Sequence, residues 1–247
     1  MPLFFTAPEN IRKSEKIILI YGNEARHIIK SLRYKKNDQI LISDGKGNKY
    51  ISIIDNYKHQ VLQCKIVRSI PDNLNSGISK IVLAQSILKS NKMDFIIQKS
   101  TELGITSIIP FISSRTIPMV SSINFDKKLK RWQKIAYESS KQSERTIIPE
   151  ILPIISFKEL LKNTANFNLT LIFWENERST NLKDVITSSP KPNKILCLIG
   201  PEGGFSDEEI KLAKDAGLKS VSLGDHYLRS ETAAIFVLSV ITYVFNF

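Results

Sequence analysis

A chain of 247 residues is long enough for one large domain or two ordinary ones, and its 42% hydrophobic fraction is enough for a buried core. No apolar run approaches the roughly 18 residues of a membrane-spanning helix, and residues 1–8 lack the regions of a signal peptide, so we expect a cytoplasmic protein with no membrane partner. The net charge is +11, and residues 1–75 carry 13 Lys or Arg against 7 Asp or Glu, which indicates a polyanionic partner such as nucleic acid, the alternative being a merely Lys-rich surface.

Residues 1–70 read as short strands joined by turns. The segment Asp44-Gly-Lys-Gly-Asn48 is a strong hairpin turn. Several short strands at this spacing predict a small β-barrel. The predicted strands are 17–20, 39–43, 50–54 and 60–67.

One helix interrupts these strands, with Asn23 as its expected N-cap. Arg26, Lys30 and Arg33 fall at helical spacing and would share one face. A charged stripe is often only a solvated helix face. A stripe of one sign favours contact with phosphates, so we predict that these three residues bind RNA.

The polar segment around Ser76 and Gly77 predicts a domain boundary. Beyond it, apolar strands alternate with amphipathic helices. That order predicts a parallel sheet covered by helices on both faces. The expected strands are 81–85, 105–111 and 169–174, and the expected helices are 91–103 and one capped by Asn124. The two cysteines, Cys64 and Cys197, lie in apolar runs and are read as buried thiols rather than zinc ligands, so no metal is expected.

The last part of the chain contains two strand–loop–helix units in series. The apolar run 195–199 is followed by the loop Gly200-Pro-Glu-Gly-Gly204 and by a helix that Ser206 and Glu209 would cap and Gly217 would end. The second unit runs from Val221 through a polar loop to a helix opened by Ser230 and Glu231. The two loops would lie at the carboxyl edge of one sheet, where open α/β sheets bind ligands.

The sequence of the glycine-rich loop argues against two common types of nucleotide-binding site. It lacks the Lys-Ser/Thr of a P-loop and the G-x-G-x-x-G spacing of a dinucleotide fold. Its free backbone groups suit an adenine edge and a ribose better than a triphosphate. Arg229, Ser230 and Glu231 form the plausible reactive cluster, although a purely structural helix cap is the alternative.

Two segments together closely resemble the cofactor-site motifs of the RsmE family, SPOUT-class methyltransferases that modify N3 of a uridine in small-subunit ribosomal RNA. They are Leu198-Ile-Gly-Pro-Glu-Gly-Gly-Phe and Leu223-Gly-Asp-His-Tyr-Leu-Arg-Ser-Glu-Thr-Ala. Residues 27–33, 44–47, 98–104, 114–116, 130–135 and 142–150 are also similar to that family, so the resemblance covers nearly the whole chain.

The resemblance implies an α/β fold class with two domains. Residues 1–75 would form a PUA-like β-barrel that binds RNA, and residues 76–247 a SPOUT methyltransferase domain with a parallel sheet and a trefoil knot. The protein would be a homodimer. It would use S-adenosyl-L-methionine, without a metal, to methylate a specific uridine in 16S ribosomal RNA, as naked rRNA or in the small ribosomal subunit.

The resemblance also implies the site residues. Arg229 would stabilise the developing uracil anion, and Glu231 would act as base or orienter. Gln98, Glu102 and Arg115 would shape the RNA side. The cofactor would lie against Phe173, Trp174, Leu198, Ile199, Gly200, Pro201, Glu202, Gly203, Leu223, Gly224, His226, Tyr227 and Leu228.

His226 stands where the family pattern has an arginine. Any role of that arginine in holding cofactor or RNA is therefore in question. Two alternatives follow from the residues: a SPOUT methyltransferase acting on another RNA such as tRNA, or a non-catalytic RNA-binding factor in ribosome assembly.

Overall fold

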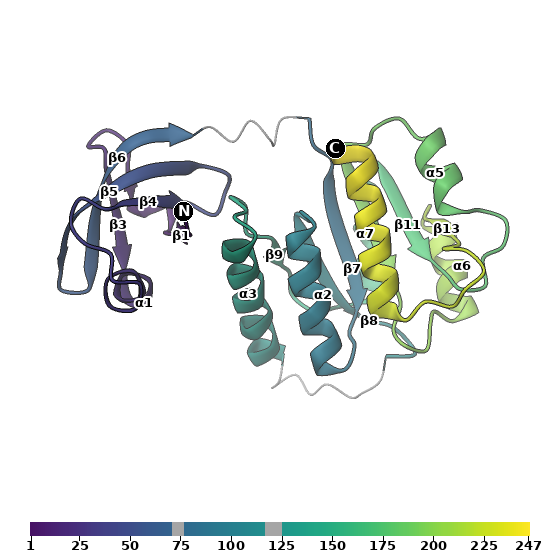
Figure 1. Cartoon of the computed structure of the whole chain (residues 1–247). Helices are drawn as coiled ribbons and strands as arrows, with labels where there is room; N and C mark the ends of the chain where they lie inside the picture. The colour runs from purple at the N-terminus through teal and green to yellow at the C-terminus, as the bar shows by residue number, and fades with distance from the viewer. Residues whose placement is uncertain (71–76, 117–124) are drawn as a thin grey trace. The chain divides into compact units, whose positions relative to one another are not determined.

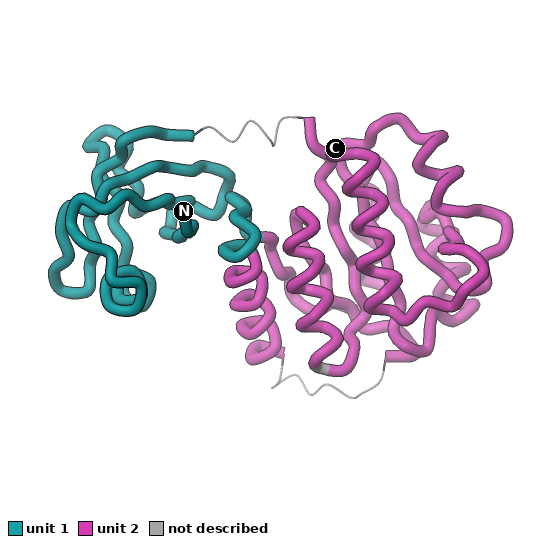
Figure 2. Tube along the Cα trace, viewed as in Figure 1, with its two compact units in different colours: residues 1–76, 140–148 teal, residues 77–139, 149–247 magenta. Residues whose placement is uncertain are grey.

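A computed structural model describes residues 1–70, 77–116 and 125–247 (Figure 1). The chain forms two compact units, coloured separately in Figure 2. The first consists of residues 1–76 and 140–148, and the second of residues 77–139 and 149–247. The segment 140–148, expected in the second domain, thus belongs to the first unit. The predicted cap Asn124 lies outside the described residues.

The first unit is built on a six-stranded sheet with the order β1-β4-β5-β6-β3-β2. Only the β1–β4 pair is parallel. The strands are β1 (Leu3–Phe5), β2 (Ile11–Arg12), β3 (Ile17–Tyr21), β4 (Gln39–Ser43), β5 (Lys49–Lys58) and β6 (Val61–Ile70).

The core of this unit follows the two-residue period of its strands. Tyr50 and Ile54 of β5 point inward and join Phe4, Ile18 and Leu62 in one cluster. The predicted turn between β4 and β5 is confirmed, since the Asp44 carboxylate accepts hydrogen bonds from the backbone N–H groups of residues 46 and 48. The next turn, at residues 59 and 60, has positive φ at both positions without a glycine and gave no signal in the sequence.

The predicted helix of the first unit differs in two respects. It begins at Gly22 rather than after an Asn23 cap, as α1 (Gly22–Arg26), and continues as one π-helical turn, η2 (His27–Ser31). Arg33 lies beyond its end with a φ of 60°, so it does not share a regular helical face with Arg26 and Lys30. Helical spacing therefore misplaced the third cation, because a π-turn and a left-handed residue break the 3.6-residue period.

The segment 140–148 completes the first unit around the β4–β5 turn. The Ser43 hydroxyl and the Gly47 N–H both donate to the Thr146 carbonyl, and the Ile148 N–H donates to the Gly45 carbonyl. The Lys141 ammonium group lies 2.9 Å from the Glu24 carboxylate in α1. These contacts join residues about a hundred positions apart in the chain.

The second unit contains a parallel seven-stranded sheet with the order β10-β8-β7-β12-β11-β13, and β9 pairs with β8. This confirms the predicted parallel sheet. The strands are β7 (Lys80–Ser86), β8 (Ser107–Ile112), β9 (Glu150–Ile151), β10 (Ile155–Ser156), β11 (Leu169–Phe173), β12 (Lys194–Ile199) and β13 (Lys219–Val221). The helices are α2 (Ser90–Glu102), α3 (Phe125–Gln142), α4 (Phe157–Lys162), α5 (Leu182–Ser188), α6 (Asp207–Asp215) and α7 (Ser230–Asn246).

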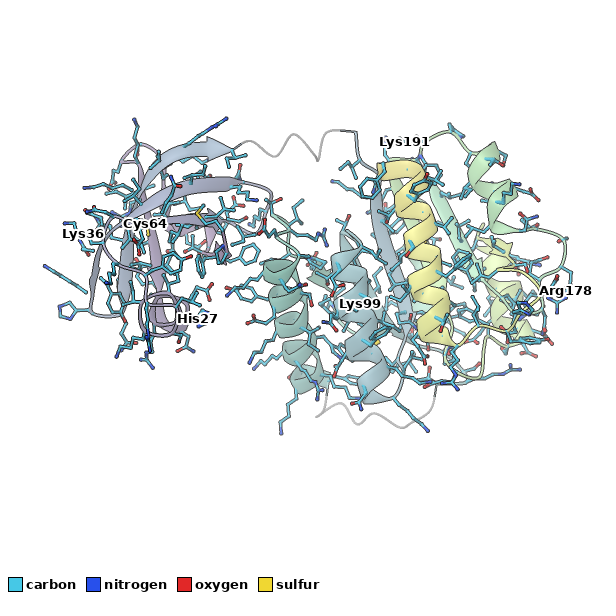
Figure 3. The ribbon with its side chains drawn as sticks, in the orientation of Figure 1. His27, Lys36, Cys64, Lys99, Arg178 and Lys191 are labelled. Atoms are coloured by element: carbon cyan, nitrogen blue, oxygen red, sulfur yellow. The ribbon has the colours of Figure 1, made fainter. Side chains whose placement is uncertain are left out.

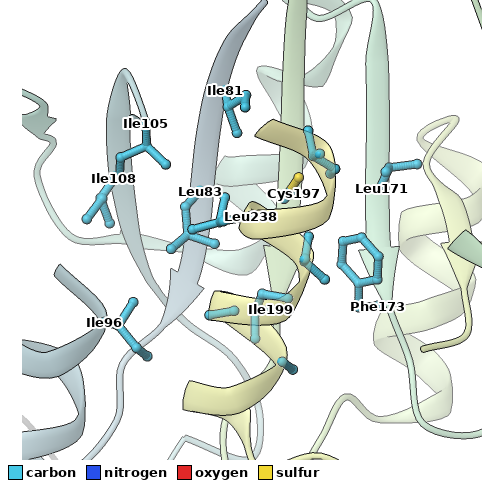
Figure 4. Close-up of a cluster of buried hydrophobic side chains, with 14 of the residues drawn as sticks. Ile81, Leu83, Ile96, Ile105, Ile108, Leu171, Phe173, Cys197, Ile199 and Leu238 are labelled. Atoms are coloured by element: carbon cyan, nitrogen blue, oxygen red, sulfur yellow. The ribbon is translucent and has the colours of Figure 1, made fainter. Parts of the chain in front are cut away.

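Both faces of this sheet are buried. On one face, Leu83, Cys197 and Leu171 pack against α2 and α7 through Ile96 and Leu238 (Figure 4). On the other face, alternate residues of the same strands pack against α4 and α6 in a second cluster that includes Val82, Leu198, Phe157 and Ile210. The near-continuous apolar strands of the sequence are explained by burial on both sides.

The strand order places three loops at one edge. β12 lies between β7 and β11, and β13 follows β11. Since all of these strands are parallel, their carboxyl ends meet at the same edge, and the loops after β11, β12 and β13 begin there.

Candidate active site

A cavity of about 490 Å³ opens at this edge of the second unit. It is lined by the loops that follow β11, β12 and β13, by the start of α7, and by Lys92 from the first turn of α2. Its size is that of a pocket for a nucleoside-sized ligand.

The loop after β12 is fixed by the helix that follows it. Ser206 accepts a hydrogen bond from the Glu209 N–H, and the Glu209 carboxylate accepts one from the Ser206 N–H, so the predicted capping box is confirmed. The Glu209 carboxylate also accepts hydrogen bonds from the N–H and hydroxyl of Ser114. Arg115, the next residue, donates from its guanidinium to the Gly203 carbonyl at 3.0 Å.

Gly204 brings two loops into direct contact. It has a φ of +66°, and a Cβ atom there would lie 1.9 Å from Oε1 of Glu175 in the loop after β11. A side chain at this position would therefore be strained and would also collide with the carboxylate.

A buried hydrogen-bond network joins the loop after β12 to the start of α7. The Ser230 hydroxyl donates to the Gly200 carbonyl at 2.6 Å, and the Gln85 amide donates to the Ser230 oxygen at 3.1 Å. Gln85 lies at the carboxyl end of β7 and is fully buried. The floor of the cavity is thus held by uncharged groups.

The loop after β11 is organised by the buried carboxylate of Glu177. One of its oxygens accepts hydrogen bonds from the N–H groups of Arg178 and Ser179 and from the Ser179 hydroxyl. Burial alone would raise the pKa of Glu177, but the hydrogen bonds from Ser179 and the charge of Lys214 outweigh it and lower that pKa to about 2. Trp174, Glu175 and Arg178 of the same loop line the cavity, and Arg178 is labelled in Figure 3.

The structure brings most of the predicted cofactor residues together. All of them line the cavity except Leu198, whose side chain points to the opposite face of the sheet and packs with Ile210. The alternation of a strand explains this difference, because its neighbour Ile199 faces the cavity. The lining residues among those predicted are Phe173, Trp174, Ile199, Gly200, Pro201, Glu202, Gly203, Leu223, Gly224, His226, Tyr227 and Leu228.

Several lining residues were not predicted from the sequence. Lys92 and Arg178 gave no signal because the cavity gathers them from separate elements. Glu175 and Asp225 adjoin predicted positions and could have been found by extending the motifs, and Ser230 belongs to the reactive cluster expected from the sequence. The remaining ones are Gly204, Phe205, Ser222 and Ala233.

The cations of the cavity differ in their partners. Lys92 lies 3.4 Å from a carboxylate oxygen of Glu202 and 3.4 Å from one of Glu231. Arg178 donates to the backbone carbonyls of residues 175 and 177. Arg229 is exposed and forms no ion pair with any residue in the described part of the chain. Its guanidinium is the one best placed to meet a ligand.

The lining of this cavity does not include the other predicted site residues. Glu231 does not line it, and its carboxylate faces Lys92 instead. Gln98 and Glu102 lie further along α2, where Glu102 pairs with Lys99 (labelled in Figure 3). Arg26 donates to the Gln60 side chain at 2.9 Å within the first unit.

The described residues contain no group of three or more His, Cys, Asp or Glu side chains placed to hold a metal ion. Both thiols are buried, and burial raises their pKa values, that of Cys64 to about 12 with a further contribution from Asp55. Within the same ranges of the chain, none of the helices combines the length and the hydropathy of a membrane span.

Comparison with known families accounts for both units. Residues 75–242 match the family described as an RNA methyltransferase domain, and residues 20–56 match an RNA methyltransferase PUA domain. The chain is 35% identical to the ribosomal RNA small subunit methyltransferase E of Mesomycoplasma hyopneumoniae, over 93% of this chain and 96% of that protein. It is 30% identical to the protein of the same name from Bacillus subtilis, over 91% and 89% of the two chains.

Solved structures are similar over the same extent. A ribosomal RNA small subunit methyltransferase E from Neisseria gonorrhoeae, bound to S-adenosyl methionine, is 33% identical, with a TM-score of 0.85 over 99% of this chain and 98% of that one. A putative methyltransferase from Legionella pneumophila in complex with the same cofactor is 29% identical, with a TM-score of 0.84 over 98% of this chain and 96% of that one.

Proposed function

The chain belongs to the ribosomal RNA small subunit methyltransferase E family, and we propose that it transfers a methyl group from S-adenosylmethionine to N3 of one uridine in 16S ribosomal RNA. Family membership makes it an RNA methyltransferase. The observation that carries the proposal is a cavity formed by three loops at one sheet edge, whose lining includes Arg229, an arginine without an ion pair to any described residue. A ribosomal RNA substrate implies a cytoplasmic location.

The residues of the cavity fit the cofactor. Gly200, Gly203 and Gly204 leave backbone rather than side chains along part of the wall, which suits the edge of an adenine and a ribose. Phe173, Ile199 and Leu223 supply apolar surface, and Glu175 and Asp225 supply carboxylates for hydroxyl or ammonium groups. The bound cofactor supplies an electrophilic methyl group, whose bond to sulfur breaks as its bond to N3 forms.

The protein must promote loss of the N3 proton. This proton titrates about two units above neutral, so ionising N3 costs about 3 kcal/mol at ~1.4 kcal/mol per unit. The guanidinium of Arg229 would lower this cost by stabilising negative charge on the uracil oxygens. Glu231, two residues later, would receive the proton or orient the group that does.

Nucleoside mapping tests the proposal. Ribosomal RNA from cells that lack the gene, incubated with purified protein and cofactor, should gain N3-methyluridine at a single position of the small-subunit RNA. Mass spectrometry of nuclease fragments locates the modification. Methylation confined to tRNA would contradict the rRNA substrate, and cofactor binding without methylation of any RNA would contradict the enzymatic role.

We further propose that the first unit binds the RNA substrate and the second carries out the reaction. The first unit contains the PUA match and the concentration of positive charge. Arg26, Lys30 and Arg33 are exposed and would contact phosphates. A fragment of the substrate that binds equally well after all three are neutralised would contradict this role.

The exposed face of α7 supports a homodimer. Phe236, Tyr243 and Val244 recur at helical spacing and are 44%, 74% and 44% exposed, and Phe95 of the adjacent α2 is 44% exposed. Exposed apolar side chains on two adjacent helices fit a protein interface. Light scattering should give a dimer for the wild type and a monomer for Tyr243→Asp with Phe236→Asp, whereas Leu212→Asp on α6, 41% exposed, should leave the mass unchanged.

The hydrogen bonds of β13 support a trefoil knot. The Val221 carbonyl accepts from the Trp174 N–H, while Ser222 bonds to Thr180 and to Leu182. The chain at the end of β13 therefore contacts both ends of the loop that follows β11, as a chain threaded through that loop would. A crystal structure whose backbone path contains no knot would contradict this proposal.

A further inference from the structure

Lys92 connects two parts of the cavity through a pair of carboxylates. Its ammonium group lies 3.4 Å from Oε1 of Glu202 and 3.4 Å from Oε2 of Glu231. Glu202 belongs to the loop after β12, and Glu231 to the first turn of α7. One cation from a third element, α2, therefore lies between two carboxylates that would otherwise repel each other.

Glu231 depends on this cation more than Glu202 does. The Glu231 side chain is only 17% exposed, and its Oε2 atom is buried without a hydrogen bond from any described residue. A buried carboxylate oxygen without a hydrogen bond is unfavourable unless an opposite charge lies close by. Lys92 supplies that charge, and its side chain is 32% exposed at the cavity wall.

The backbone that carries Glu202 and Glu231 is held in place by hydrogen bonds that do not involve Lys92. The Ser230 hydroxyl and the Gln85 amide tie the start of α7 to the Gly200 carbonyl. The ion pairs of Lys92 therefore determine where the two glutamate side chains lie, rather than whether the loops form.

We infer that Lys92 is a positioning residue for methyl transfer. It holds the Glu231 carboxylate at the start of α7 and the Glu202 carboxylate beside the glycines of the cofactor loop. The inference rests on the proposed function, in which Glu231 assists removal of the N3 proton. Methyl transfer requires close alignment, and a misplacement of about 1 Å costs about 10²-fold in rate.

Substitutions of Lys92 separate this role from a structural one. Lys92→Met keeps most of the stem but removes the charge, and it should lower kcat about 10²-fold while changing the Kd for S-adenosylmethionine by less than about threefold. Lys92→Arg should restore most of the activity because it retains the cation. Lys211→Met, which removes an exposed lysine of α6, controls for the loss of one positive charge.

A double-mutant cycle then tests whether Lys92 acts through Glu231. If it does, Lys92→Met combined with Glu231→Gln should be no slower than Glu231→Gln alone. Additive losses would overturn the inference, as would full activity of Lys92→Met. A loss confined to the cofactor Kd would also overturn it, by making Lys92 a cofactor-binding group.

The same measurements distinguish failure of the inference from failure of the proposed function. Wild-type protein that binds the cofactor but does not methylate small-subunit RNA would overturn both. An active wild type with an equally active Lys92→Met variant would overturn the inference alone. Thermal unfolding of each variant, compared with Lys211→Met, identifies any loss of folded protein, and Lys92→Gln replaces Lys92→Met if that variant does not fold.

Discussion

At the scale of single residues, the candidate site depends on which charged groups already have partners. Lys92 and Arg178 are engaged within the protein, whereas Arg229 is exposed at the same cavity and has no ion pair among the described residues. An unpaired guanidinium carries five donors that suit the oxygens of a uracil or a phosphate. Arg229 is the single arginine between Ser222 and Ser230.

Arg229→Ala should lower kcat about 10²- to 10³-fold at saturating cofactor, because it removes a group that stabilises developing charge. Single-turnover methylation of small-subunit RNA measures the effect. Arg229→Lys should recover part of the rate, since it keeps the charge without the planar donors. A near wild-type rate for Arg229→Ala would remove this residue from the mechanism.

Glu177 gives a pH-dependent prediction. Its pKa is about 2 in the folded protein against an ordinary value of 4.5, so its contribution to stability is present above about pH 4.5 and is lost as the pH falls towards 2. Glu177→Gln should therefore reduce the free energy of unfolding by about 2 kcal/mol at neutral pH. Urea titrations at pH 7 and pH 3 should show this difference shrinking, whereas Glu9→Gln, at an exposed position, should differ little from wild type at either pH.

At the scale of elements, local signals were good guides where the chain itself supplies the hydrogen bonds. The Ser206–Glu209 capping box and the turn at Asp44 were predicted correctly because short-range groups satisfy the backbone there. The prediction that Asn23 caps α1 was wrong, since the helix begins at Gly22 and no side chain caps it. A strand's alternation was also needed to separate Ile199, which faces the cavity, from Leu198, which does not.

The loop after β12 should be sensitive to a side chain at its last glycine, because φ is positive there and the Glu175 carboxylate would have to move away. Gly204→Ala would place a methyl group against the Glu175 carboxylate, so we expect the Kd for S-adenosylmethionine to rise at least about tenfold. Gly217→Ala is the matched control: its φ is also positive, at +85°, but nothing lies within 4 Å of the added carbon. If calorimetry gave the two variants equal Kd values for S-adenosylmethionine, the contact between residue 204 and Glu175 would not be the cause of weaker binding.

The exposed cations Arg26, Lys30 and Arg33 should determine how RNA binding responds to salt. Replacing Arg26, Lys30 and Arg33 with Gln should reduce the slope of log K against log salt by about two, since each lost phosphate contact accounts for about 0.7 to 0.9. The expected change is below the maximum for three contacts because Arg26 also binds Gln60. A triple control, Lys158, Lys183 and Lys211 to Gln, should change the slope less, and an unchanged slope in the first variant would contradict the assignment.

At the scale of the whole molecule, the sequence predicted the kinds of layers but not all of the contacts between distant segments. Alternating apolar strands and amphipathic helices indicated a parallel sheet covered on both faces, and this is confirmed. Periodicity reports which face of an element is buried and not what it is buried against. Lys92 therefore gave no sign that it would meet Glu202 and Glu231, and residues 140–148 gave none that they would join the first unit.

The membership of residues 140–148 in the first unit limits how that unit can be separated. A fragment of residues 1–76 would lose the bonds from Ser43, Gly45 and Gly47 to the missing segment, and the Glu24–Lys141 pair. We expect it to unfold at lower denaturant than the same fragment joined through a flexible linker to residues 140–148, as measured by circular dichroism. Equal midpoints would show that the segment contributes nothing.

The polypeptide passes between the two units three times, after residues 76, 139 and 148. The first unit is therefore encoded in two separated stretches of the gene, and a single recombination event cannot transplant it intact onto another enzyme. A chimeric protein that carries this unit would also need residues 140–148. These residues would have to be inserted at the end of a helix of the receiving protein.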